Sequence, residues 1–171
     1  MPSDPTAAPA SPATRPTAPR VVLDSNIWVD LLVFRDPRVE PIRQALESGA
    51  IATVIRADCR EELRRVLHYP QFARFAIDHA AALAVVDGFA TLLPPPDEAA
   101  AGAVRLPKCK DGDDQKFIEL AHFSGAACLV SKDKAVLKLA GRLRRSSQVQ
   151  VLAPAAFPAW LAGRDGAPTP G

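Results

Sequence analysis

The chain has 171 residues, enough for one globular domain with a sizeable core and too few for two ordinary domains. Hydrophobic residues make up 48% of the sequence, which suits a soluble folded protein, and the formal net charge is only +2. A net charge this small excludes a strong overall attraction to nucleic acid or to an anionic membrane, so any basic binding surface must be local.

The two ends of the chain differ in composition from its middle. Residues 1–19 hold six of the 17 prolines and lack the apolar core of a signal peptide, which predicts a disordered, proline-rich leader. Residues 163–171 predict a flexible tail, so the domain itself is expected over residues 20–162. No apolar run approaches the length of a transmembrane helix, and no membrane partner is expected.

The first half of the domain predicts two strands, each followed by helical segments. An apolar, β-branched run over residues 21–23 is typical of a buried strand. An Asp-Pro pair then starts a helix over residues 36–48, with Asp as the N-cap and Pro at the first helical position. A second strand is predicted over residues 51–55. The next helix begins at Asp58, which has capping-box spacing to Glu61, and ends before Pro70.

The second half continues the alternation. Residues 72–93 are alanine-rich with apolar residues at helical spacing, which predicts one or two helices, and three consecutive prolines stop them. Further strands are predicted over residues 103–106, 127–131 and 149–152. Further helices are predicted around residues 117–121, over 133–143 and over 155–161, where Pro158 is expected to break the last one. This alternation predicts a three-layer α/β domain with a mainly parallel, five-stranded sheet.

Acidic side chains lie where the predicted strands end. Asp24 directly follows the first strand, and Asp133 follows the fourth by one residue. Ligands of open parallel sheets collect beyond the carboxyl ends of the strands. Two further acids belong to the same neighbourhood: Glu62 lies one turn into the helix after the second strand, and Asp114 lies in the loop before the helix that precedes the fourth strand.

Carboxylates that converge at one edge repel each other and raise each other's pKa unless a cation neutralises them. Mg²⁺ and Mn²⁺ prefer oxygen ligands, and no His or Cys accompanies these acids in sequence. A metal held in this way lowers the pKa of a bound water and stabilises charge on a phosphoryl group under attack. That is the chemistry of phosphodiester cleavage.

Each acid also has an ordinary structural explanation. Residues 24–26 could form a turn that caps a helix, Glu62 could be an exposed helix residue, and Asp133 could simply cap its helix. For Asp111 and Asp113, a role in the turn and at the helix N-terminus is the first interpretation. Only the joint placement of the acids at strand ends favours a metal site.

Other residue types give weaker signals. Six basic residues occur between Lys132 and Arg145, which would suit a phosphate backbone, although a solvated helix face explains them as well. The sparse aromatics could stack on bases, but core packing accounts for them too; these are Trp28, Trp160 and Tyr69. The cysteines are odd in number and form no CxxC pair, which indicates reduced thiols in a cytoplasmic protein; they are Cys59, Cys109 and Cys128.

Four segments, in order along the chain, resemble the motifs of the PIN-domain ribonuclease family. The opening motif is RVVLDSNIWVDLL, the second is DCREELRRVLHYPQF, and the third and fourth together are CKDGDDQKFIELAHFSGAACLVSKDKAVL. The segment VQVLAPAAFPAWL resembles the tail of a bacterial subgroup of PIN-type toxin components. The resemblance covers about residues 20–161.

The resemblance implies a Rossmann-like, PIN-like sheet in which the first and fourth strands are adjacent. It also implies a ribonuclease that depends on Mg²⁺ or Mn²⁺ and acts on RNA, homodimers, and a small antitoxin partner for the toxin members. By position, the catalytic and metal-binding acids would be Asp24, Glu62, Asp114 and Asp133, with Asp111 as an additional metal-site acid and Asn26 and Ser131 as supporting polar residues.

Two alternatives remain at this point. An aspartate-nucleophile phosphatase would also place Asp24 after a first strand, but it would need a second acid where this chain has Asn26. A PIN-like protein-interaction module with a catalytically silent site is the other. Metal binding that depends on Asp24 separates this module from an enzyme.

Overall fold

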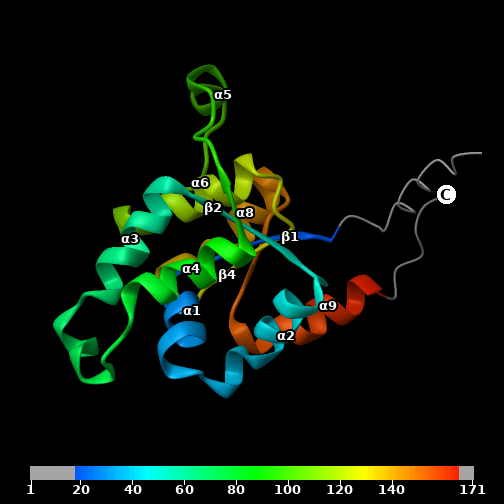
Figure 1. Cartoon of the computed structure of the whole chain (residues 1–171). Coiled ribbons are helices and arrows are strands. Elements are labelled where there is room, and N and C mark those ends of the chain that lie inside the picture. The colour runs from blue at the N-terminus through cyan, green and yellow to red at the C-terminus, as the bar shows by residue number, and fades with distance from the viewer. Residues whose placement is uncertain (1–17, 166–171) are drawn as a thin grey trace, which may run out of the picture.

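The centre of the fold is a five-stranded, all-parallel sheet with helices on both faces (Figure 1). The computed structural model describes residues 18–165. The strand order is β3-β2-β1-β4-β5, which confirms the predicted α/β class and the adjacency of the first and fourth strands. The strands are β1 (Arg20–Leu23), β2 (Ala52–Arg56), β3 (Ala90–Leu93), β4 (Cys128–Val130) and β5 (Gln150–Leu152).

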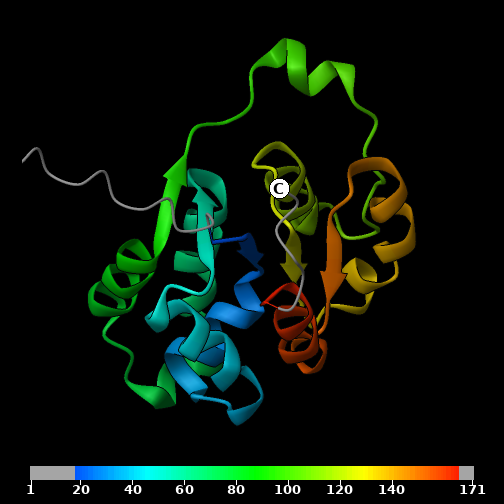
Figure 2. The same ribbon diagram turned by 90° about the vertical axis from the view of Figure 1, so that its right-hand side faces the viewer.

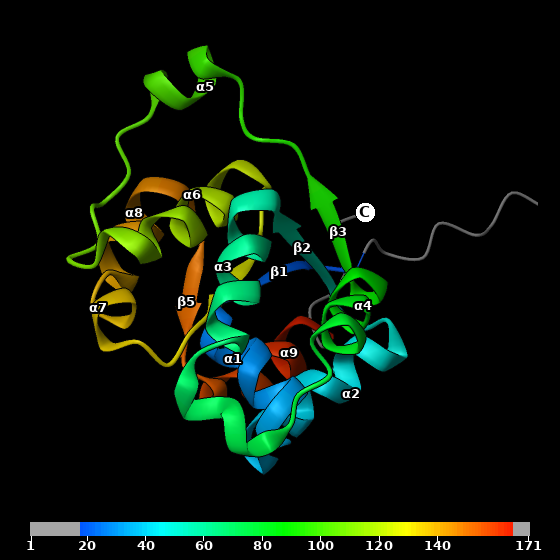
Figure 3. The same ribbon diagram turned by 60° about the vertical axis from the view of Figure 1, so that its left-hand side comes forward.

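Along the chain, the segments that connect successive strands are mainly helical (Figures 2 and 3). Short 3₁₀ turns and one π-helical turn join the helices. The α-helices are α1 (Ser25–Val29), α2 (Glu40–Ser48), α3 (Ala57–Leu67), α4 (His79–Phe89), α5 (Glu98–Ala103), α6 (Gln115–Phe123), α7 (Lys134–Leu137), α8 (Ala140–Ser147) and α9 (Phe157–Asp165). The π-helical turn is Asp30–Phe34, and the 3₁₀ turns are Pro37–Val39, Pro70–Phe75, Gly112–Asp114 and Pro154–Ala156.

Strand β1 lies between β2 and β4 and is buried on both faces. Val21, Val22 and Leu23 are at most 2% exposed, as expected for a central strand of a parallel sheet. The chain moves from β1 to β2 on one side and later crosses to β4 on the other. The carboxyl ends of β1 and β4 therefore form the topological switch point, where open α/β sheets bind their ligands.

The third strand is not where the sequence predicted it. Residues 103–106 form no strand, and β3 instead occupies the end of the stretch 72–93 that was predicted to be helical. All four residues of β3 pair with β2, so Thr53 is opposite Ala90 and Arg56 is opposite Leu93. The spacing of apolar residues is a weak signal over the four residues of β3. These residues form a strand because they pair with β2, and such a non-local contact cannot be inferred from the local sequence pattern.

The predicted capping box at the start of α3 is wrong. The N-cap is Arg56, whose side chain makes no capping hydrogen bond. Asp58 instead accepts hydrogen bonds from the guanidinium of Arg56 at 2.7 Å, and Glu61 pairs with Arg64 at 2.6 Å. Because Arg56 is only 8% exposed, its charge needs a hydrogen-bonded acidic partner, and this need outweighs the local preference for a capping box.

The last helix is longer than predicted. Pro158 is the second residue of α9, so its missing N–H falls in the first turn, where no intrahelical partner exists, and the helix is not broken. The helix continues to Asp165, where the guanidinium of Arg164 lies 5.1 Å from the centre of the Trp160 ring. Residues 163–165 thus belong to α9 and not to the expected tail. Within residues 18–165, no helix is both long and apolar enough to cross a membrane.

The outcome of the remaining sequence predictions is mixed. The helix predicted over residues 133–143 is divided into α7 and α8. Gly49 has a φ of 74° and ends α2, as its position predicted. The cysteines at 59, 109 and 128 are free and buried. The expected leader lies outside the described residues except for residues 18 and 19, as do residues 166–171 of the expected tail.

Candidate active site

Asp24 and Asp133 leave neighbouring strands at the same edge of the sheet. The backbone N–H of Asp24 donates to the carbonyl of Val130 at 3.0 Å. The hydroxyl of Ser131 donates to Oδ2 of Asp24 at 2.6 Å and accepts from the backbone N–H of Asp133 at 3.0 Å. One hydroxyl therefore holds the end of β1 and the loop after β4 in a common arrangement.

A second hydrogen bond joins the same two loops. Oδ1 of Asn26, in α1, accepts from the backbone N–H of Lys132 at 3.2 Å. Asn26 and Ser131 are the polar residues that the family resemblance assigned a supporting role. In the structure they connect the loops that carry the two strand-end acids.

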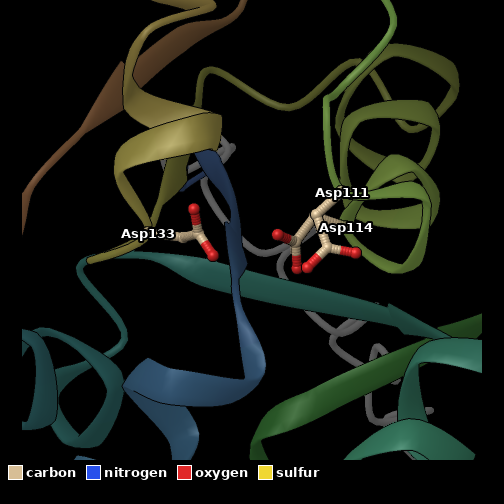
Figure 4. Close-up of side chains that lie close together, drawn as sticks. All are labelled: Asp111, Asp114 and Asp133. Carbon is tan, nitrogen blue, oxygen red and sulfur yellow. The ribbon is translucent and has the colours of Figure 1, made fainter.

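A cluster of three carboxylates forms where α6 and α7 begin. Asp111, Asp114 and Asp133 each offer an oxygen atom, and these atoms lie within 4.8 Å of one another. Figure 4 shows Asp133 facing Asp111 and Asp114 across a gap, with the two sides contributed by segments that are distant in sequence. Oδ2 of Asp114 is buried, and within residues 18–165 it has no hydrogen-bond partner.

Two members of this cluster also have the structural role that the sequence suggested. Oδ1 of Asp133 accepts from the backbone N–H of Ala135 at 2.7 Å and caps α7. Oδ1 of Asp111 accepts from the backbone N–H of Asp113 at 3.0 Å and caps the turn before α6. In both residues the cap involves one carboxylate oxygen, which leaves the other oxygen available as a ligand.

Glu62 lies beside this cluster but outside it. Its Oε2 accepts from the hydroxyl of Ser25 at 2.9 Å, and its Oε1 pairs with Nζ of Lys116 at 3.3 Å. The side chain of Glu62 lines a cavity of about 320 Å³ together with Asp24 and Asp114. Three of the predicted acids thus line one cavity, and one of them, Asp114, also belongs to the carboxylate cluster with Asp111 and Asp133.

The electrostatics of the site disfavour ionisation. Burial raises the pKa of Asp24 to about 6; the charges of Glu62 and Asp133 add to this, and the hydrogen bond from Ser131 opposes it. The pKa of Asp114 rises to about 7, first because of burial and then because of the charges on Asp24 and Asp133. A bound cation would remove this repulsion.

The donor set fits a hard divalent cation. Every candidate ligand atom is a carboxylate oxygen, as Mg²⁺ and Mn²⁺ prefer. The buried, unpartnered oxygen of Asp114 is a group whose burial costs free energy unless something binds it. The carboxylates present at this edge are therefore a suitable set of ligands for a divalent metal.

Sequence reasoning missed a further acid at this edge. Asp30 is 3% exposed and pairs with Nζ of Lys132 at 2.6 Å, beside the strand-end acids. A signal was present, since an acid within the apolar run WVDLLVF must be buried with a partner or face a cavity. The sequence of that run could not predict that the partner is Lys132, because the two residues lie about a hundred positions apart in the chain.

The comparison with protein families identifies the class of protein. A family model described as PIN domain matches residues 20–135, a range that contains the acids from Asp24 to Asp133. The chain belongs to the PIN-domain family, as the four motifs indicated. PIN domains are generally nucleases and typically use divalent metals.

Comparison with solved structures finds matches of low similarity. One match is FitAB bound to the IR36 DNA fragment, at 16% sequence identity and a TM-score of 0.46. The alignment covers 79% of this chain and 95% of that chain. A likeness of this size says nothing about function. No curated protein sequence matches this chain significantly.

Proposed function

We propose that this protein is an endoribonuclease that depends on Mg²⁺ or Mn²⁺. The carrying observation is the group of convergent carboxylates at the switch point between β1 and β4, which includes the unpartnered oxygen of Asp114. Convergent acids with raised pKa values destabilise a metal-free fold, so their presence is best explained by a cation that they bind. The membership of a family of nucleases supports the choice of reaction.

The acids divide into two roles in this proposal. Asp24, Asp114 and Asp133 hold the metal directly or through water, and Asp111 contributes to the same centre. The metal would supply a strong nucleophile at neutral pH and stabilise charge on the scissile phosphoryl group. Glu62, which Ser25 and Lys116 hold in place, orients the attacking water from the neighbouring wall of the cavity.

Positive charge near this edge suits a polyanionic substrate. Lys132 lies in the loop after β4, where its backbone N–H donates to Asn26; its side chain is 37% exposed and pairs with Asp30. The other basic residues of this segment are also exposed, namely Lys134, Lys138, Arg142, Arg144 and Arg145. They can contact the phosphates of a strand on either side of the cut, which makes binding dependent on salt.

The test combines metal binding and cleavage in one buffer. Mn²⁺ is titrated into the wild-type protein and the Asp24→Asn variant by calorimetry, and both are then incubated with a mixed RNA pool. We expect binding and cleavage by the wild type only. No Asp24-dependent binding of Mn²⁺ and no cleavage of any RNA would favour the silent interaction module. Release of phosphate from p-nitrophenyl phosphate in place of RNA cleavage would favour the phosphatase.

We further propose that the nuclease is the toxin of a toxin–antitoxin pair and acts in the cytoplasm as a homodimer. The bacterial-type C-terminal segment supports the toxin assignment, and the three free, buried thiols suit a reducing compartment. Induced expression of the wild type should arrest growth, and Asp114→Asn should not. Relief of the arrest by the protein of the neighbouring gene would identify the antitoxin. Sedimentation of the purified protein measures the oligomeric state.

A further inference from the structure

The cavity that contains the acids has a second, aromatic wall. Tyr69 and Phe34 line it together with the carboxylates, and their exposed fractions are 48% and 44%. The buried Phe72 also lines the cavity, and Phe75, which is 38% exposed, contacts the ring of Phe34. Aromatic rings gathered beside a polar site, and left exposed, indicate a binding surface for something with a flat apolar face.

Helix α3 connects the acid to the aromatic wall. Glu62, Val66 and Tyr69 all line the cavity, and their spacing of four and then three residues places them on one side of the helix and the turn that follows it. The backbone N–H of Tyr69 donates to the carbonyl of Val66 at 3.0 Å, which continues that side beyond the end of α3. A single element therefore sets the offset between the carboxylate and the ring.

The ring of Phe34 is fixed in its exposed position. It makes edge contacts with Phe72 and Phe75, with ring centres 5.7 and 5.1 Å apart. Phe34 is also the last residue of the π-helical turn, and Arg35 follows it with a φ of 47°. π-Helical turns are rare, and a non-glycine residue at positive φ is uncommon. The turn therefore ends with Phe34 at the cavity.

We propose that Tyr69 and Phe34 form a subsite that stacks an unpaired nucleobase of the substrate strand, next to the phosphate that a metal bound by the acids would hold. The inference rests on the proposed nuclease function and extends it to a base-binding contact. A nucleobase presents the flat face that the rings require, and the phosphate attached to it can reach Lys132, which lines the same cavity. Bases that are paired and stacked in a duplex do not expose this face, so the subsite selects single-stranded segments.

Tyr69 itself supplies a direct probe of the subsite. It is the only tyrosine of the chain, so protein labelled with 3-fluorotyrosine gives one ¹⁹F resonance. We expect adenosine 5′-monophosphate to shift this resonance saturably and ribose 5-phosphate, which lacks the base, to shift it far less. Equal shifts with both compounds, or no shift with either, would overturn the proposal. Neither compound has a phosphodiester bond, so the result does not depend on cleavage.

Cleavage of a single-stranded RNA oligonucleotide gives the second readout. Tyr69→Ala and Phe34→Ala should each raise KM about tenfold with a smaller change in kcat, as expected for the loss of one stacking contact. Tyr69→Phe keeps the ring and should stay within about twofold of the wild type. Leu92→Ala, on the exposed surface of β3, is the matched control and should change nothing.

The two proposals fail in different ways. If the wild type cleaves RNA and Tyr69→Ala has an unchanged KM, the subsite is wrong and the nuclease function stands; the aromatic wall would then belong to a protein partner. If the wild type cleaves no RNA while adenosine 5′-monophosphate shifts the Tyr69 resonance, the proposed function is wrong and the base-binding site stands.

Discussion

Asp113 and Asp114 are neighbours with the same side chain and very different surroundings. Asp114 precedes Phe117 by three residues and Ile118 by four, so it lies on the side of α6 that packs on the sheet; those two residues are at most 1% exposed. Asp114 accordingly lies in the carboxylate cluster, whereas Asp113 is exposed. The helical spacing that distinguishes the two acids is visible in the sequence, and their difference in exposure agrees with it.

Substitutions in the acid loop follow from this difference. Asp114→Asn should lower the cleavage rate by orders of magnitude, because the variant loses a charged metal ligand. Asp113→Asn should cost several-fold at most. Asp111→Asn should cost about tenfold, with weaker Mn²⁺ binding, since Asp111 lies at the exposed side of the cluster. Cleavage rates of the three variants at several Mn²⁺ concentrations test this order. An inactive Asp113→Asn beside an active Asp114→Asn would show that the motif register is off by one.

The raised pKa values of Asp24 and Asp114 predict a pH dependence of stability. Their pKa values of about 6 and 7 exceed the ordinary value of 3.8, so the folded protein binds more protons than the unfolded chain between about pH 4 and 7. Without metal, the free energy of unfolding must fall as the pH rises through this window. The melting temperature should be roughly 5 °C higher at pH 5 than at pH 8.

The control for this dependence is Asp114→Asn, which removes one of the two titrations and part of the repulsion. Its metal-free melting temperature should vary less with pH and exceed that of the wild type at pH 8. Mn²⁺ should stabilise the wild type at pH 8 and have little effect on the variant. An equal pH dependence in both proteins would mean that ionisation of Asp114 does not destabilise the folded protein.

At the scale of elements, Ser131 is the connection between β1 and the loop from β4 to α7. Ser131→Ala leaves Oδ2 of Asp24 and the N–H of Asp133 without their partner in a fully buried place. The expected loss of stability is about 1–3 kcal/mol, measured by urea unfolding without metal. Ser131→Thr retains the hydroxyl and should keep most of this stability. If Ala and Thr behave alike, the hydroxyl does not hold the two loops.

Helix α5 is the element that contributes least to the fold. It stands away from the rest of the molecule on extended arms (Figure 1), and none of its six residues is buried. Replacing residues 98–103 by a glycine-serine linker should change the melting temperature by no more than about 1 °C. Leu63→Ala, at a fully buried position of α3, should cost about 2–5 kcal/mol by comparison. A large loss from the α5 replacement would mean that the helix docks on the domain.

The elements that the sequence predicted well are those with local signals. Glycine at positive φ ended α2, and an uninterrupted apolar run formed β1. The strand β3 depends on its pairing with β2, and the start of α3 depends on the ion pairs of Arg56, so neither was predictable from its own residues. Pro158 is a third case. Helix α9 begins at Phe157 and not at residue 155 as predicted, so the proline falls in the first turn, where it does not disrupt the helix.

At the scale of the molecule, the strand order determines which acids meet. The pairing of β1 with β4 brings Asp24 beside Asp133, although more than a hundred residues separate them. Placement at strand ends predicted this neighbourhood, and the family resemblance supplied the adjacency of the two strands. The distances within the site were not predictable, because they depend on how α3 and α6 pack. Glu62 consequently contacts Ser25 and Lys116 and is not part of the cluster formed by Asp111, Asp114 and Asp133.

The most direct test of the metal-dependent nuclease is cleavage of a mixed RNA pool by the purified full-length protein, with Mn²⁺, with a chelator, and with Asp114→Asn. Because the convergent carboxylates repel one another and a bound cation would relieve this repulsion, we expect cleavage by the wild type in Mn²⁺ alone. Full cleavage in the chelator, or by Asp114→Asn in Mn²⁺, would contradict the metal centre.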